Sequence, residues 1–395
     1  MWRTFRSVIE DDFIDEEDII AKIQYLDTLT RHHQYILWED NTNSISSRVT
    51  SAIQKLPEEH RKAALALFAN IIYLPKPILD EAWREVAFSL ERLYKQECTL
   101  HFFDTFYFSV DNPGLVTNFS HIAGLKGRED HDVNPGFTTI SDIIDRLSNL
   151  IEKKNGDVDT KDIIILMNKK KWVILSDNSI SGGSLVSDVK KLSKIKAILF
   201  PIGLTPPFIE ASSKFTPPEM YAATQITTEQ ALSSLNEIIP TDKIAYGIKF
   251  DDSVRVVSDK CKLFHKKETL NAVRKLCEWF GDRYFLNQLD PDYKRRIEVH
   301  VNSGGKENYA YGWKDCGYTI VTQDNALSNS VPIIYYNPPE NEILLNKEQV
   351  DGYTPPFLRI ESRVSHTTSK DKDKLSGLEK WDNVKYIRKL IYGTS

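Results

Sequence analysis

The sequence has few cysteines, and they do not form a metal-binding or redox pattern. The 395 residues include four cysteines, Cys98, Cys261, Cys277 and Cys316, and no two of them make a CxxC pair. Zinc ribbons and thiol–disulfide motifs are built on such pairs, so neither class is indicated. Scattered single cysteines in a chain of this size are typical of a reducing cytosol.

Long apolar runs are also absent. The most apolar segment covers residues 63–74 and is interrupted by Asn70, whereas a membrane-spanning helix needs about 20 apolar residues. Residues 10–18 are rich in Asp and Glu, at the place where a secretory signal would need an apolar stretch. We therefore expect a cytoplasmic protein without a membrane segment.

Neither sign of charge dominates the chain. It has 51 Lys and Arg against 56 Asp and Glu, a formal net charge of −5. Direct nucleic-acid binding is not expected from this balance, because it provides no broad attraction to a polyanion. Hydrophobic residues make up 41% and charged residues 27%, as in ordinary globular proteins. The length predicts one elaborated domain or two domains.

The first part of the chain has the periodicity of helices. Pro57 and the acids after it are typical of a helical first turn. Apolar residues then recur at helical spacing up to Leu74, and Pro77 opens a second helix. The apolar face of this second helix is expected to contain Ile78, Ala82, Trp83, Val86, Leu90, Leu93 and Tyr94. We expect residues 1–97 to form a helical N-terminal region.

From residue 98 the pattern becomes that of an α/β domain. Residues 99–110 are rich in Phe and Tyr and predict a strand, which a turn signal and a polar loop at 120–136 follow. A strand at 172–175, a helix at 184–192 and a strand at 197–200 have the spacing of a parallel crossover. Other expected elements are a helix after Ser141, strands at 244–250, 253–257, 318–322 and 333–336, and a helix at 268–280.

The end of the chain is polar and then amphipathic. Residues 363–374 are charged and resemble a linker. Ser376 and Glu379 form a capping-box pattern before a helix with one apolar face. The expected division is therefore 1–97, a helical region; 98–362, an α/β domain; and 363–395, a linker and a helix that docks on the body or on a partner.

A glycine pair between the strand at 172–175 and the helix at 184–192 predicts a phosphate site. Gly182 and Gly183 allow the backbone to approach an anion, and the N–H groups of the helix start point at it. Ser181 and Ser184 can add hydroxyl donors, and Asp177 at the strand end can accept hydrogen bonds from sugar hydroxyls. The alternative is a tight turn with Asp177 as a helix cap. Neither the GxxxxGK[ST] nor the GxGxxG phosphate motif fits here.

Residues 172–185 resemble the phosphoribosyl pyrophosphate (PRPP) binding motif of type I phosphoribosyltransferases. That motif has apolar strand residues, two acids, four variable residues, Gly-Gly, and Ser or Thr. The resemblance implies an α/β fold with a type I phosphoribosyltransferase-like parallel sheet, between the N-terminal helical region and the C-terminal extension. It also implies that Asp177 is catalytic and holds the ribose hydroxyls, with Mg²⁺ as a possible cofactor. The implied substrate-binding residues in the loop are Ser176, Asn178, Ser179, Ser181, Gly182, Gly183 and Ser184.

Ser176 stands where the motif has its first acid. This difference predicts weak Mg²⁺ dependence, and Ser176→Asp is expected to tighten Mg²⁺-dependent PRPP binding.

A second resemblance covers more of the chain. The order of helical region, aromatic strand, loop and residues 312–363 is similar to a phosphoribosyltransferase-like family linked to bacterial conflict systems, whose members are proposed anti-phage effectors. Asp324 and Asn325 follow a predicted strand and are candidates for the same cleft as Asp177; the alternative is that Asn325 satisfies the backbone of a turn. Three functions stay open: an enzyme acting at C1 of ribose, a nucleotide sensor, and a scaffold for a protein partner of a defence system.

Overall fold

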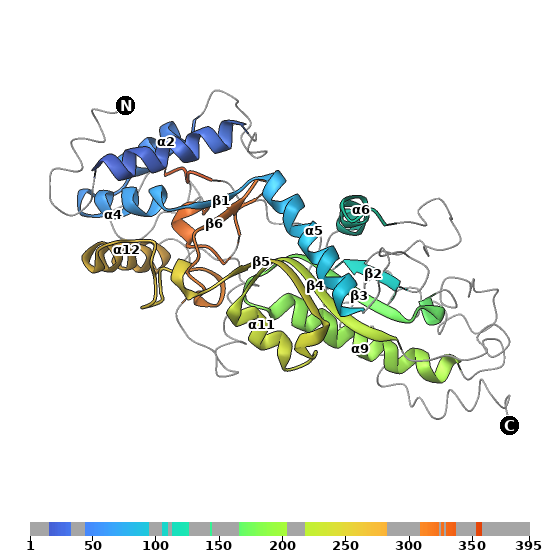
Figure 1. Ribbon diagram of the computed structural model, residues 1–395. Helices are drawn as coiled ribbons and strands as arrows, with labels where there is room; N and C mark the ends of the chain where they lie inside the picture. The colour runs from blue at the N-terminus through green and yellow to red at the C-terminus, as the bar shows by residue number, and fades with distance from the viewer. Residues whose placement is uncertain are drawn as a thin grey trace, which may run out of the picture. The chain divides into compact units, whose positions relative to one another are not determined.

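The computed structural model describes two compact units. The described residues are 16–32, 44–94, 105–109, 113–125, 143, 166–203, 218–282, 309–323, 325–327, 329–336 and 353–357. One unit combines Met1–Leu79 with Phe250–Glu361, and the other combines Asp80–Lys249 with Ser362–Ser395 (Figure 1). We call them the first and second units. The division expected at residues 97 and 362 stays a prediction about domains.

The first unit is mainly helical. Its two short strands, β1 (Ile72–Leu74) and β6 (Ile320–Thr322), pair in parallel, with Ile72 opposite Ile320. Helix α4 packs against α2, α3 and α12. The helices are α2 (Glu16–His32), α3 (Ile45–Lys55), α4 (Glu58–Ala69) and α12 (Lys267–Phe280), and the 3-10 helices are η2 (Asp252–Val254), η4 (Trp313–Asp315) and η5 (Pro332–Ile334).

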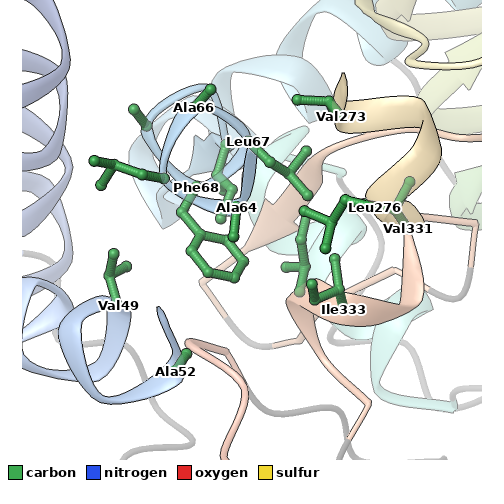
Figure 2. Close-up of a cluster of buried hydrophobic side chains, with 14 of the residues drawn as sticks. Val49, Ala52, Ala64, Ala66, Leu67, Phe68, Val273, Leu276, Val331 and Ile333 are labelled. Atoms are coloured by element: carbon green, nitrogen blue, oxygen red, sulfur yellow. The ribbon is translucent and has the colours of Figure 1, made fainter. Parts of the chain in front are cut away.

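The core of the first unit joins segments that are far apart in sequence. Figure 2 shows Leu67 and Phe68 of α4 among Val273 and Leu276 of α12 and Ile333 of η5. All five side chains are fully buried. Burial of such a side chain contributes roughly 1.5–3 kcal/mol. Residues on both sides of the second unit in sequence therefore share one hydrophobic core.

Helix α4 ends earlier than the apolar spacing predicts. Helical periodicity continues to Leu74, but α4 stops at Ala69 and residues 72–74 form β1. The Asn70 side chain donates to the Ala66 carbonyl over 2.8 Å, and the Ile72 N–H donates to the Thr319 carbonyl over 2.9 Å. Helix α4 therefore ends here for two reasons. The Asn70 side chain competes for a helical carbonyl, and the next residues pair with β6.

The second unit is a sheet with helices on both faces. Strands β2 (Thr105–Ser109), β3 (Lys171–Ser179), β4 (Glu219–Thr228) and β5 (Ile244–Phe250) lie in that order, and β2, β3 and β4 pair in parallel. The parallel α/β architecture and the strand at 244–250 are therefore confirmed. Of the aromatic strand expected at 99–110, the structure describes β2.

Alternate side chains of the sheet enter two separate cores. On β3, Trp172 and Ile174 pack with α9 (Gly183–Gly203) and α11 (Glu229–Asn236), whereas Val173 and Leu175 pack with α5 (Lys76–Leu93) and α6 (Pro113–Ile122). Figure 1 shows these two pairs of helices on opposite faces. Because both faces are covered, residues 172–175 of the strand are apolar at every position rather than at every second one.

Three predicted strands are wrong. Residues 197–200 continue α9, in which Leu192, Ile195 and Leu199 are buried at helical spacing, and the next strand is β4. A short apolar run cannot distinguish a buried strand from a buried helix. The strands expected at 253–257 and 333–336 begin instead within the 3-10 helices η2 and η5, and Arg255 makes an isolated bridge to Tyr318.

A side-chain cap and a proline explain the 3-10 helices η2 and η5. Asp251 caps η2 by accepting the Ser253 N–H over 2.8 Å, and Pro332 lies at the start of η5.

Part of the loop expected at 120–136 belongs to α6. The helix after Ser141, apart from Ile143, lies outside the described residues, as do the linker and the C-terminal helix. Among the helices that are described, none has the length and apolarity to cross a membrane.

Candidate functional site

Strand β3 runs further toward the glycine pair than the sequence predicts. It continues to Ser179, which lies opposite Thr227 of β4. Ser176, Asn178 and Ser179 are therefore strand residues at the carboxyl end of a parallel sheet. The connection to α9 consists of Ile180, Ser181 and Gly182 alone. Ligands of open parallel sheets bind at this end of the strands.

Gly182 has a conformation and surroundings that only glycine fits. Its φ is +76°, and a Cβ added there would lie 3.1 Å from the Ser234 Cβ and 3.2 Å from the Ala231 Cα on α11. The left-handed region is costly for residues with a side chain. The Gly182 carbonyl accepts the Val186 N–H over 2.9 Å. Gly182 is therefore the cap from which α9 starts.

The first turn of α9 presents donors without helical acceptors. The N–H groups of Gly183, Ser184 and Leu185 precede the first intrahelical bond. Gly183 is half-buried and Ser184 is exposed, whereas the Ser181 side chain is largely buried. Backbone donors and the helix dipole at this end favour an anion. Of the two serines expected to add a hydroxyl, Ser184 is the accessible one.

Ser176 is a buried strand residue whose hydroxyl is already used. It is 4% exposed, and its Oγ donates to the Asn178 carbonyl over 2.8 Å. Thr224, opposite Ser176 on β4, makes the same contact, because its Oγ1 donates to the Ile226 carbonyl over 2.8 Å. The serine at the position of the first acid of the PRPP-binding motif therefore stabilises the local strand geometry.

This environment changes the expected effect of restoring the acid. Ser176→Asp should lower the thermal midpoint, since burying a carboxylate costs several kcal/mol. Thermal unfolding with and without Mg²⁺ measures this. Ser184→Asp is the matched control, because an acid in an exposed first turn is neutral or stabilising by about 0.5 kcal/mol. A Ser176→Asp variant that is as stable as the parent and gains stability from Mg²⁺ would contradict this expectation.

Asp177 is the exposed acid at the strand end. Its Oδ1 accepts the Asn178 backbone N–H over 2.7 Å and the Asn178 Nδ2 over 3.0 Å. These two bonds hold the carboxylate near the carboxyl end of β3, the strand that leads into α9. Asn178, which was expected to bind substrate, therefore contacts Asp177 and orients it.

The next strand contributes residues that the sequence analysis missed. The Ser179 hydroxyl is buried and has no hydrogen-bond partner among the described residues, and the Ser179 carbonyl accepts from Thr227 Oγ1 over 3.2 Å. The Ile180 carbonyl accepts from Thr228 Oγ1 over 2.6 Å. A threonine before an acid is a helix-cap signal, and Thr228-Glu229 carried it.

The late segment belongs to the first unit. The Asn325 N–H donates to Thr322 Oγ1 over 3.2 Å, and the Asn325 carbonyl accepts the Thr322 N–H over 2.9 Å. Asn325 thus closes a turn after β6, as the alternative interpretation had it. Asp324 lies outside the described residues. Since Asp177 is in the second unit, the shared cleft stays a prediction.

Among the described residues, few side chains at the loop could be ligands of a metal ion. They contain no group of three or more His, Cys, Asp or Glu side chains arranged to hold one. Asp177 supplies one carboxylate, and its Oδ1 already accepts two N–H groups. Mg²⁺ can be bound through one carboxylate when phosphates and water complete its shell. The described residues therefore fit a Mg²⁺ ion that is bound through Asp177 and completed by substrate phosphates and water.

Most of the chain is similar to a known protein family. A family model named PRTase-CE matches residues 49–359, which is more than half of the chain and includes the loop. No curated protein and no solved structure matched the chain. The chain therefore belongs to the PRTase-CE family, a phosphoribosyltransferase-like family.

Proposed function

We propose that this protein binds a phosphoribosyl compound, PRPP or a nucleotide, and holds its phosphate on the backbone of residues 181–184. The observation that carries the proposal is the left-handed Gly182 directly before the first turn of α9. Such a turn at the carboxyl end of a parallel strand gathers backbone donors around one point. Ser184 is exposed and can add its hydroxyl.

Asp177 is proposed to bind the sugar. Its carboxylate is exposed, precedes the loop by a few residues and carries the wrong charge for a phosphate. Reaction at C1 of ribose requires a positioned leaving group and stabilisation of an oxocarbenium-like transition state. It requires no protein nucleophile. Mg²⁺, when bound at Asp177, would offset charge on the pyrophosphate.

A sensor that binds without turnover is the second candidate. It is favoured by Ser176, which is buried and bonded to the Asn178 carbonyl where the family has an acid. Incubating the pure protein with PRPP and Mg²⁺ and measuring pyrophosphate or ribose 5-phosphate separates the candidates. Release of either product supports an enzyme, and binding without release supports a sensor.

Asp177→Asn should weaken PRPP binding by about tenfold or more while leaving inorganic phosphate binding nearly unchanged. The physical reason is the loss of a charge-assisted hydrogen bond to a sugar hydroxyl, worth roughly 1.5–3 kcal/mol. Asparagine keeps an oxygen that can still accept the Asn178 N–H. Calorimetric titration with both ligands measures the difference.

Asp251→Asn is the matched control for this substitution. Asp251 also accepts a backbone N–H, from Ser253 over 2.8 Å, but it lies in the first unit. Its replacement should change neither affinity. Equal losses of PRPP and phosphate affinity in Asp177→Asn would contradict the sugar assignment.

We further propose a cytoplasmic effector of bacterial anti-phage defence, controlled by a protein partner. The support is the resemblance on the motif order, and it is an analogy, since a fold does not fix a function. The scaffold alternative depends on the helix that the sequence predicts at the C-terminal end, in residues that the structure does not describe.

A further inference from the structure

The end of β4 is polar although it is buried. Thr224, Thr227 and Thr228 are fully buried. Buried hydroxyl groups need hydrogen-bond partners. The acceptor of each hydroxyl therefore shows which backbone segment that threonine holds in place. Thr224 bonds within its own strand, to Ile226. Thr227 and Thr228 bond to the neighbouring chain segment instead.

These two threonines hold the backbone just before the loop. Thr227 Oγ1 donates to the Ser179 carbonyl over 3.2 Å, and Thr228 Oγ1 donates to the Ile180 carbonyl over 2.6 Å. The Ile180 side chain is itself buried. Two consecutive carbonyl groups are therefore fixed at the point where β3 leads into Ser181 and Gly182.

Thr228 has a second contact that leads back to the loop. It is the cap of α11, with φ −131° and ψ 165°, and its Oγ1 accepts the Ala231 N–H over 3.1 Å. A Cβ at Gly182 would lie 3.2 Å from the Ala231 Cα. Thr228 is therefore bonded to Ile180, two residues before Gly182, and also to Ala231, the residue against which Gly182 lies.

We propose that Thr228 is a positioning residue of the phosphate loop. Its hydroxyl fixes the Ile180 carbonyl and the first turn of α11 together, so that Gly182 keeps its left-handed conformation and the α9 donors face one point. The conformation of the loop and the cap of α11 depend on the same Thr228 hydroxyl. Phosphate bound at the loop therefore also stabilises the cap of α11. This inference rests on the phosphate site proposed above.

The chain offers matched variants to test Thr228. Thr228→Val keeps the shape but removes the donor to Ile180 and the acceptor for Ala231. Thr228→Ser keeps both. Thr224→Val removes an equally buried hydroxyl from the same strand, one that donates within β4. Loss of a generic buried hydrogen bond therefore affects Thr224→Val as well, whereas loss of loop positioning affects only Thr228→Val.

Calorimetric titration with ribose 5-phosphate is the test. Thr228→Val should weaken binding by about tenfold, since leaving buried groups unpaired costs on the order of one tenfold step in affinity. Thr224→Val and Thr228→Ser should bind like the parent chain. Full affinity in a folded Thr228→Val, or an equal loss in Thr224→Val, would overturn the positioning role.

Hydrogen exchange of the unsubstituted protein gives a measurement that depends on no variant. Ribose 5-phosphate should slow exchange of the Ala231 amide, which bonds to Thr228. Unchanged exchange at saturating ligand overturns the coupling. Absence of any binding by the parent chain overturns the proposed function, and the inference with it. Binding that Gly183→Val removes and Thr228→Val leaves intact keeps the function and rejects the inference.

Discussion

Replacement of Gly183 by valine should abolish binding of ribose 5-phosphate while the chain stays folded. Gly183 is the first residue of α9, and its φ is not positive, so an L side chain meets no backbone strain there. The branched side chain would occupy the space through which a phosphate reaches the first-turn N–H groups. Losing two charge-assisted bonds of roughly 1.5–3 kcal/mol each corresponds to about a hundredfold or more in affinity.

Calorimetry and thermal unfolding together measure this effect. Ser193→Val is the control, because it places the same residue on the same helix about 15 Å further along, where the Ser193 hydroxyl bonds to Val189 and Met220. It should bind like the parent. Gly182→Val is not a suitable test, since the φ of +76° makes loss of fold and loss of binding inseparable. Unchanged affinity in Gly183→Val would rule out the loop as the phosphate site.

The sequence predicts elements whose signals are local and misses those that depend on distant partners. Helix α12 and strand β5 have clear periodicity and flanking signals, and both were found within one residue. Strand β1 was missed because it needs β6, about 250 residues away in the chain, as its partner. The apolar residues 197–200 were misassigned because a short apolar run cannot distinguish a helix from a strand.

The site shows the same division. The glycine pair predicts the turn and the helix start, and the structure has both. Spacing within one segment cannot reveal that β3 runs on to Ser179, because that extension depends on pairing with β4. For the same reason Ser176 was expected to face a ligand, although its hydroxyl bonds to Asn178. The contacts of Thr227 and Thr228 cross between strands and were invisible for the same cause.

Expression of this protein with its neighbouring genes should protect a bacterium against phage, and the protection should depend on the loop. Asp177→Ala or Gly183→Val should reduce plating protection to the level of an empty vector. Three features motivate the prediction besides the family. A large helical segment precedes the sheet, Ser176 replaces an acid that a salvage enzyme would need, and the sequence after residue 362 predicts a linker and a capped amphipathic helix.

The loop variants alone would not distinguish loss of the site from loss of the protein. Asp251→Asn and Ser193→Val, which change exposed residues outside the proposed site, should therefore be expressed beside them and should protect like the parent. Immunoblots must find equal amounts of all variants, because a fall in stability of 1–2 kcal/mol changes abundance several-fold. If the loop variants protect as well as the parent at equal abundance, the phosphate site is not the effector. The protein would then act through its surfaces, and the scaffold function would be the better explanation.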